Sequence, residues 1–77
     1  MATEEPSPLD ELRARGLTAR EIEVLRLIGE GRSNREIGEV LFISAKTASV
    51  HVTHILQKLN VATRVQAAIA ADRLALG

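Results

Sequence analysis

The chain has 77 residues, with ten basic and ten acidic side chains, no cysteine and a single aromatic residue, Phe42. A chain of this length builds one modest core and leaves no room for a sizeable catalytic pocket, and without cysteine it forms neither disulfides nor thiolate metal sites. It shows no secretion signal and no apolar run near the ~20 residues of a membrane span, so we expect a cytoplasmic protein without a membrane anchor.

The net charge of zero hides an uneven distribution along the chain. Residues 1–30 carry seven acids and four bases, whereas residues 31–77 carry six bases and three acids. The second part of the chain is therefore the part suited to a polyanionic partner. Because this excess of positive charge is small, we expect the affinity for such a partner to depend on dimerisation.

Residues 1–16 begin as a polar tail and contain one candidate for a short helix. Ser7 followed by Pro8 is typical of an N-cap and a first helical residue. Leu9 and Leu12 are spaced to form the apolar side of this helix. We treat the segment as a tail or linker with a short helix inside it.

Two capping boxes predict the starts of two further helices. TARE at 18–21 precedes an apolar run that ends at Gly31, and SNRE at 33–36 precedes a short helix that ends near Leu41. We expect the apolar residues at helical spacing to face the core. They are Ile22, Leu25 and Ile28 in the first of these helices, and Ile37, Val40 and Leu41 in the second.

Two more helices are predicted after residue 41. Residues 42–44 form a tight turn, and Ser44 is the N-cap of a long helix over 45–59. Asn60 tolerates the left-handed conformation that ends many helices. TRVQ at 63–66 then caps an alanine-rich helix that reaches about residue 75. With no strand predicted, the chain is a compact all-α domain.

The helix that ends near Leu41 and the helix over 45–59 are joined by a turn too short for antiparallel packing. Such pairs cross steeply, as in a helix-turn-helix. Gly38 lies in the middle of the first of them, where it costs about 1 kcal/mol in helix propensity, and its missing side chain permits a close crossing. Many such units place a glycine in the turn, but Phe42 stands there, so this turn must close differently. A helical corner without any ligand remains the alternative interpretation.

The helix over 45–59 has two unlike faces when its residues are spaced by 100°. Its apolar stripe consists of Ala48, Val52, Ile55 and Leu59. The opposite side carries Lys46, Val50, Thr53 and Gln57, with Ser49 and His54 on its flanks. This side is short-chained, polar or basic and free of acids, which suits a helix that lies in the groove of a polyanion.

Several longer motifs carry a resemblance to a known family. The segments LTAREIEVLRLIGEGRSNREIGEVLFIS, KTASVHV and ILQKLNVATRVQAA resemble the LuxR/GerE-type DNA-binding domain of bacterial transcription regulators. The resemblance covers residues 17 to about 76, with LTxRExEVL, GxSNxEI, LxIS, KT, His51, KL and Arg64 in order. LFISAKTASVHV is also similar to the output domains of large ATPase-type regulators of the family.

This resemblance implies a compact four-helix helix-turn-helix domain over 17–76 that binds double-stranded DNA sequence-specifically. The recognition helix, about 45–59, enters the major groove, and the domain is the output module of a transcriptional regulator. It implies no enzymatic activity, no cofactor and no metal. Four positions depart from the family pattern: Ala48 replaces Val, Ser49 replaces Lys or Arg, Thr53 replaces the Lys of some members, and Asn60 replaces Gly.

The resemblance also assigns site residues, which agree with the outer face of the long helix. Base contacts fall to Lys46, Ser49, Val50 and Thr53, and phosphate contacts fall to Ser33, Asn34, Arg35, Thr47 and Lys58. Lys46 suits guanine or a phosphate, and Val50 suits a thymine methyl group. We add His54 to the phosphate contacts because it lies on the same flank as Lys58.

The last helix is predicted to have two functions. Val65 and Ile69 are expected to close the core, and the small residues on its other sides are expected to pair with a second copy of the chain. The predicted dimer contacts are Ala67, Ala70, Ala71 and Leu74. We expect a homodimer on DNA and mainly a monomer when free; a plain helix of high propensity is the alternative.

Arg64 begins this helix and opposes the helix dipole, so it needs a partner elsewhere. A phosphate and an ion pair with an acid such as Glu21 both fit, and we favour the ion pair. His51 and His54 stand three residues apart, but no carboxylate or cysteine in their helix joins them, so we expect His51 to pack rather than to bind metal.

Two other classes of function remain to be weighed. A helical protein-interaction module of the transcription machinery, with RNA polymerase as a candidate partner, would need large apolar anchors on the outer face, and only Val50 is available. A hydrolase or metal enzyme would need a nucleophile and base or a ligand cluster, and the sequence offers neither.

Overall fold

The computed structural model describes residues 7–74, and these form five α-helices without any strand. The helices are α1 (Pro8–Ala14), α2 (Ala19–Gly29), α3 (Asn34–Leu41), α4 (Ala45–Leu59) and α5 (Arg64–Arg73). The all-α prediction is confirmed, and the short first helix is present. The predicted end of the last helix near residue 75 lies outside the described residues.

Each helix begins at a residue whose side chain caps it, as the local patterns predicted. The N-caps are Ser7, Thr18, Ser33, Ser44 and Thr63. In every case the hydroxyl oxygen accepts a hydrogen bond from the backbone N–H three residues later, which satisfies one of the free donors of the first turn. The helix starts are therefore determined locally.

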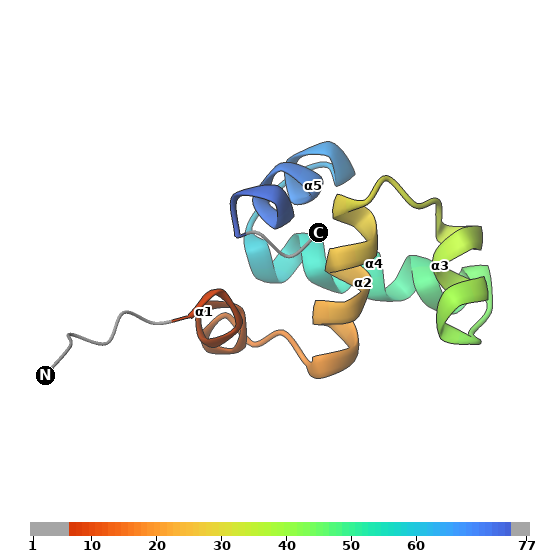
Figure 1. Ribbon diagram of the computed structural model, residues 1–77, viewed down its shortest axis with the longest axis horizontal. Coiled ribbons are helices and arrows are strands. Elements are labelled where there is room, and N and C mark those ends of the chain that lie inside the picture. Colours follow the sequence, from red (N-terminus) through yellow and green to blue (C-terminus); the bar gives the residue numbers. More distant parts are fainter. Residues whose placement is uncertain (1–6, 75–77) are drawn as a thin grey trace, which may run out of the picture.

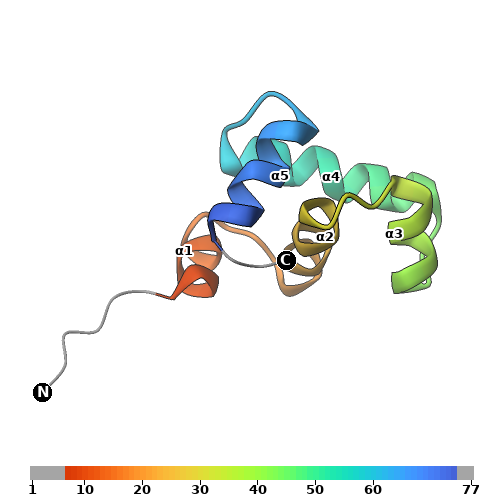
Figure 2. The ribbon, with the colours of Figure 1, turned by 45° about the horizontal axis from the view of Figure 1, so that its top comes forward.

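Helix α2 lies at the centre of the domain and packs against α3, α4 and α5 (Figures 1 and 2). Helix α4 passes along one side of α2, with α3 near its first turns and α5 near its last. The fully buried large side chains come from α1, α2, α3 and α4: Leu12, Val24, Leu25, Leu27, Ile28, Ile37 and Ile55. This core fixes α4 with one face inward and the other toward solvent.

The crossing of α3 and α4 confirms the close approach predicted at Gly38. A Cβ atom at Gly38 would lie 2.5 Å from the carbonyl oxygen of Ile43, so no other residue fits without displacing backbone. The turn closes through Phe42, which adopts the left-handed conformation with φ 60°. The N–H groups of Phe42 and Ile43 both donate to the carbonyl oxygen of Gly38, which ends α3.

The inward face of α5 differs from the predicted one. Val65 and Ile69 are 68% and 51% exposed, whereas Ala67 and Ala71 are fully buried. The reason is the short distance between α5 and α2, since a Cβ at Gly29 would lie 2.9 Å from the Cβ of Ala71. Only small side chains fit there, so the prediction that Val65 and Ile69 close the core is wrong.

Two further expectations need correction. Ala67 and Ala71 cannot contact a second copy, because the core of this domain already buries them completely. Val40 was expected to face inward, but it is 41% exposed, and the buried residues of α3 are Ile37 and Gly38. At the steep crossing with α4, the glycine takes the inward position and turns Val40 toward solvent.

Candidate nucleic-acid interface

Helix α4 presents to solvent the side chains that the sequence analysis assigned to DNA bases. Its apolar stripe of Ala48, Val52, Ile55 and Leu59 is buried, as predicted. The four base-contact candidates are all exposed: Lys46, Ser49, Val50 and Thr53. They share one side of the helix because they recur at spacings of three and four residues. The outer face of α4, defined by these four residues, is therefore available to a ligand.

Hydrogen bonds within α4 determine what its hydroxyl groups can offer. The Thr53 hydroxyl donates to the carbonyl oxygen of Ser49 at 3.1 Å, so its oxygen remains able to accept. The Ser44 hydroxyl donates to the Thr47 hydroxyl oxygen at 3.0 Å, which leaves the Thr47 proton able to donate. Thr53 therefore suits a base amino group, and Thr47 suits a phosphate oxygen.

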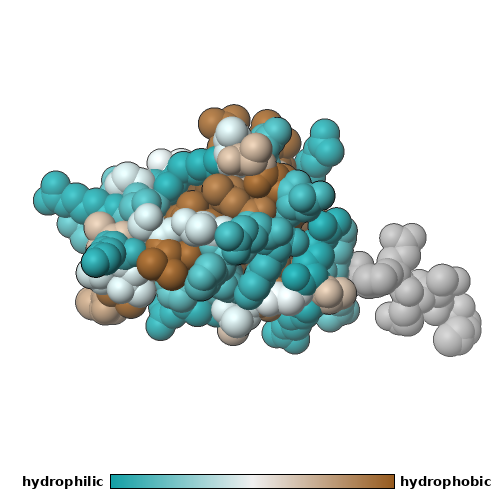
Figure 3. Space-filling model, turned by 180° about the vertical axis from the view of Figure 1, so that it is seen from behind, coloured by the Kyte–Doolittle hydropathy of each residue, from teal (hydrophilic) through white to brown (hydrophobic). Residues whose placement is uncertain are grey.

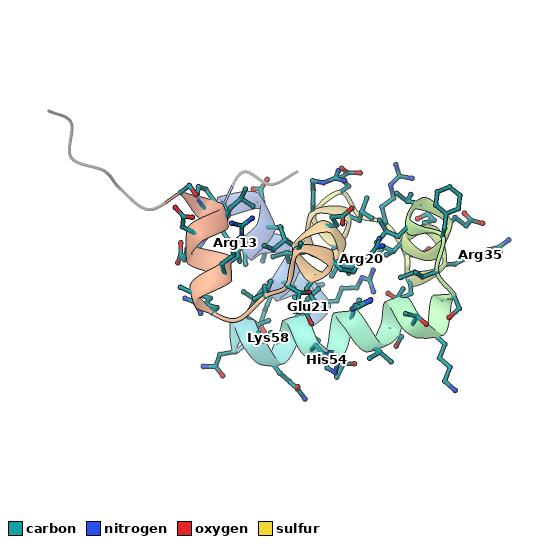
Figure 4. The ribbon with its side chains drawn as sticks, turned by 90° about the horizontal axis from the view of Figure 1, so that it is seen from below. Arg13, Arg20, Glu21, Arg35, His54 and Lys58 are labelled. Atoms are coloured by element: carbon teal, nitrogen blue, oxygen red, sulfur yellow. The ribbon has the colours of Figure 1, made fainter. Side chains whose placement is uncertain are left out.

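The outer face of α4 carries positive charge that no acid neutralises. Lys46 makes no ion pair within residues 7–74, and α4 contains no acidic residue. Arg35 is paired with Glu39 at 3.7 Å, but both side chains are largely exposed, and such pairs are weak and easily exchanged. Figure 4 shows Arg35 extending away from the domain. Both cations are thus available to phosphates.

The first turn of α3 holds the remaining phosphate candidates. Ser33 and Glu36 cap each other, with the Ser33 N–H donating to the Glu36 carboxylate at 2.9 Å. That backbone hydrogen bond lowers the pKa of Glu36 below its ordinary value. The Oδ1 atom of Asn34 accepts from Arg64, which leaves the amide N–H groups of Asn34 free to donate.

A buried carboxylate connects α2 to the second half of α4. Glu21 is only 3% exposed, and its oxygens lie 2.6 Å from Nζ of Lys58 and 3.6 Å from Nδ1 of His54. Burial raises the pKa of Glu21, but hydrogen bonds from Lys58 and from the Thr18 backbone outweigh it and lower the pKa overall. Figure 4 shows Glu21 pointing from α2 toward both residues of α4.

This arrangement alters two predictions. Lys58 and His54, assigned to phosphates, face a carboxylate of their own domain, so both side chains are less available to a ligand. The favoured ion pair between Arg64 and Glu21 is wrong. Arg64 instead donates to the side chain of Asn34 and to the carbonyl oxygen of Arg32. Lys58 occupies the position beside Glu21, whereas Arg64, at the start of α5, lies beside the residues that lead into α3.

Arg20 is a candidate that the sequence analysis did not consider. It is exposed on α2 beside Glu21 and makes no ion pair among the residues described. Arg20 is the arginine of the LTxRExEVL motif, which is the sequence signal that could have drawn attention to it. Its exposure and the absence of an ion pair within residues 7–74 make it a further candidate for a phosphate contact.

Two further findings concern metal ligands and membrane spans. No group of three potential metal-binding side chains occurs within the described part of the chain. His51 is partly buried beside the apolar stripe, and its Nδ1 atom is buried without a hydrogen-bond partner. No helix between residues 7 and 74 is long and apolar enough to cross a membrane.

The surface on the α4 side of the domain separates polar from apolar regions. Most of this face is hydrophilic, and hydrophobic side chains gather toward its upper part, where α5 lies (Figure 3). Val65 and Ile69 are the large apolar residues that α5 exposes. The polar region suits a nucleic acid and the apolar region suits a protein surface.

Comparisons with known proteins point to one family. The family described as "Bacterial regulatory proteins, luxR family" matches residues 15–71. The transcriptional regulatory protein LiaR of Bacillus subtilis is 58% identical over 57 residues, which are 74% of this chain and 27% of LiaR. DegU of Brevibacillus brevis is 58% identical over 53 residues, 69% of this chain and 22% of DegU.

The nitrate/nitrite response regulator protein NarP of Escherichia coli is 49% identical over 53 residues, 69% of this chain and 25% of NarP. The chain therefore spans less than a third of the length of these relatives. LiaR and DegU are transcriptional regulatory proteins and NarP is a response regulator. These matches do not specifically support the similarity to large ATPase-type regulators.

Proposed function

We propose, from the premise that the chain belongs to the luxR family of bacterial regulatory proteins, that α4 contacts bases in the major groove of double-stranded DNA. The family's domain is the DNA-binding, non-enzymatic part of such regulators. The observation that carries the proposal is the acid-free outer face of α4, held toward solvent by a buried stripe on the opposite side. A major groove about 12 Å wide admits one such helix.

Each base-contact residue has a chemical preference. Lys46 donates to guanine O6 and N7, and Val50 contacts a thymine methyl group. Ser49 and Thr53 are short enough to let the α4 backbone approach the base edges closely. Because the Thr53 oxygen can accept, we expect it to favour the amino group of adenine or cytosine.

The phosphate contacts come from two parts of α4 and its surroundings. Near its first turns lie Thr47 and the first turn of α3, with Ser33, Asn34 and Arg35. Backbone N–H groups at the start of a helix favour phosphate oxygens. In the second half of α4, on the same side as Thr47, lie His54 and Lys58; the ion pair with Glu21 reduces the contribution of Lys58 to the salt dependence of binding.

We place a homodimer contact on the exposed side of α5. Ala70 and Leu74 are partly exposed, and the large apolar residues beside them are Val65 and Ile69. We expect this surface to support a monomer when free and a dimer on two half-sites about one helical turn apart. The domain would act in the cytoplasm as the output module of a longer regulator, with RNA polymerase as a candidate partner.

The proposal is tested by titrating duplex DNA with the chain at several salt concentrations. We expect affinity to fall with salt, with a slope on the order of −3 to −5 per protomer. Lys46→Ala should weaken binding and lower the slope by about one. The control Arg15→Ala removes a cation from the residue that follows α1, outside the proposed interface, and should change neither. Binding that is absent at low salt, or independent of salt, would refute the proposal.

Selection of preferred sites from random duplexes tests the role of Val50. Val50→Ala should lose preference at one thymine-containing position, by about 1 kcal/mol, without changing the salt slope. If Lys46→Ala and Val50→Ala both select the parental site with unchanged affinity, α4 is not the helix that reads DNA.

A further inference from the structure

Arg64, the first residue of α5, connects two segments that are far apart in sequence. Its Nη1 atom donates to Oδ1 of Asn34 at 2.5 Å, and its Nη2 atom donates to the carbonyl oxygen of Arg32 at 2.6 Å. One guanidinium group therefore binds both chain neighbours of Ser33, the residue that caps α3. The N-terminal ends of α3 and α5 are held together by this single side chain.

The local chemistry of Arg64 does not explain its presence. A cation at the start of a helix is unfavourable because it meets the positive end of the helix dipole. No carboxylate compensates it, since Arg64 forms no ion pair within residues 7–74. Ordering a long side chain also costs entropy. The two charge-assisted hydrogen bonds are its only polar contacts in the described part of the chain.

These two bonds determine the geometry of the α3 N-terminus. Because Oδ1 of Asn34 accepts from Arg64, the orientation of the amide is set and its N–H groups remain able to donate to a phosphate. With the Arg32 carbonyl bound, the backbone entering the Ser33 cap is fixed. The donors assigned to phosphate are thus oriented before DNA arrives, which lowers the entropy lost on binding.

We infer that Arg64 is a positioning residue for DNA binding, which holds the phosphate-contacting N-terminus of α3 through Asn34 and Arg32. This inference rests on the proposed function, because it requires α3 to contact phosphates. The role is indirect: Arg64 sets the affinity for any duplex and leaves the base preference, which α4 determines, unchanged. Its position beside Val65 also joins the α3 N-terminus to the exposed side of α5.

Arg64→Lys separates this role from a direct phosphate contact. Lysine keeps the positive charge and can still reach a phosphate, but it lacks the planar fork that binds two acceptors at once. If Arg64 positions α3, the variant should lose affinity by about tenfold with an unchanged site preference. If Arg64 simply meets a phosphate, the variant should retain near-parental affinity, and the inference is wrong.

The partnership with Asn34 is tested by a double-mutant cycle. Asn34→Ala removes one of the two acceptors, so Arg64→Lys should cost clearly less affinity in that background than in the parent. Fully additive losses would overturn the inference. Arg73→Lys, at the exposed end of the same helix, is the matched control and should leave affinity unchanged.

Two readouts distinguish a rejected positioning role from a folding defect and from a failure of the proposed function. Urea unfolding should show that Arg64→Lys is folded under the binding conditions, and backbone amide NMR shifts should change mainly at residues 32–36. Shifts confined to α5 would contradict the inference. If the parent chain itself does not bind duplex DNA, the proposed function fails, whereas parental binding with an unaffected Arg64→Lys variant rejects only the positioning role.

Discussion

Two glycines bring pairs of helices close together, but they face different atoms. A Cβ at Gly38 would lie 2.5 Å from the carbonyl oxygen of Ile43 and 3.2 Å from the carbonyl carbon of Ser44, both backbone atoms. A Cβ at Gly29 would lie 2.9 Å from the Cβ of Ala71, a side-chain atom. The α3–α4 corner is therefore fixed by the backbone, whereas the α2–α5 contact is set by a side chain that substitution can change.

The strongest test of this difference is Gly38→Ala. The new methyl group would displace the turn that leads into α4, and the gain in helix propensity of about 1 kcal/mol offsets only part of the strain. We expect a loss of about 3 kcal/mol in the free energy of unfolding, measured with urea. DNA affinity should fall as well, because the corner sets the direction of α4.

A change in stability below about 0.5 kcal/mol would show that the corner can move, and that it is no more rigid than the α2–α5 contact. Circular dichroism of the variant should still show a helical protein, because each helix has its own cap.

A third contact, between Glu21 on α2 and Lys58 on α4, depends on charge and so responds to pH. The pKa of Glu21 is lowered in the folded protein, so its contribution to stability is present above the ordinary glutamate pKa of 4.5 and is lost as pH falls through the lower folded pKa. We expect Glu21→Gln to cost about 2 kcal/mol at pH 7.

The measurement is urea unfolding of parent and Glu21→Gln between pH 7 and pH 3. The difference in stability between the two proteins should shrink as the pH falls. Part of the acid sensitivity should survive in the variant, because the pKa of Glu36 is lowered as well. A difference that stays constant over this range would show that the Glu21 carboxylate does not stabilise the fold through its charge.

The α2–α5 contact should tolerate a compensating exchange that the corner cannot. Gly29→Ala crowds Ala71 and should cost about 1 kcal/mol, and Ala71→Gly should cost about 1–2 kcal/mol through lost burial and helix propensity. In the double variant the methyl group changes sides, so the loss should be smaller than the two single losses combined, by about 1 kcal/mol.

Unfolding free energies of the four proteins give this coupling energy directly. Additivity within about 0.3 kcal/mol would mean that the two positions do not compete for one space. That result would remove the reason given for the burial of Ala71 and the exposure of Val65.

These contacts also show which features the sequence could predict. The helix starts were predicted correctly because their signals are local: capping boxes at 18–21, 33–36 and 63–66, and N-cap serines at Ser7 and Ser44. The acid-free side of α4 was predicted because its apolar stripe, Ala48 to Leu59, has a clear helical period. The base and phosphate assignments made on that side stay predictions until binding is measured.

The inward face of α5 could not be predicted in the same way. Its alanines lie on several sides, so the apolar pattern does not favour one face, and the choice is made by Gly29 on another helix. The dipole argument correctly required a distant partner for Arg64. It could not choose Asn34 over Glu21, because that choice depends on how α3 and α5 meet in space.

The smallest predicted effect concerns the two non-glycine residues in the left-handed conformation. Phe42 ends α3 with φ 60°, and Asn60 ends α4 with φ 56°. Asparagine tolerates this conformation, whereas a bulky residue is strained in it. The Phe42 ring is 94% exposed, so it gains little packing in return. We expect Phe42→Gly to stabilise the domain by about 0.5–1 kcal/mol and Asn60→Gly to change it by only a few tenths.

Phe42→Ala separates the two causes, because it removes the ring but keeps the strained backbone. It should leave the free energy of unfolding within about 0.5 kcal/mol of the parent, while Phe42→Gly increases it. If Phe42→Gly destabilises the domain, the ring contributes to the corner despite its exposure, and the α3–α4 crossing is held by a side chain as the α2–α5 contact is. If only Phe42→Gly stabilises it, the strain lies in the backbone, in keeping with a corner that backbone atoms define.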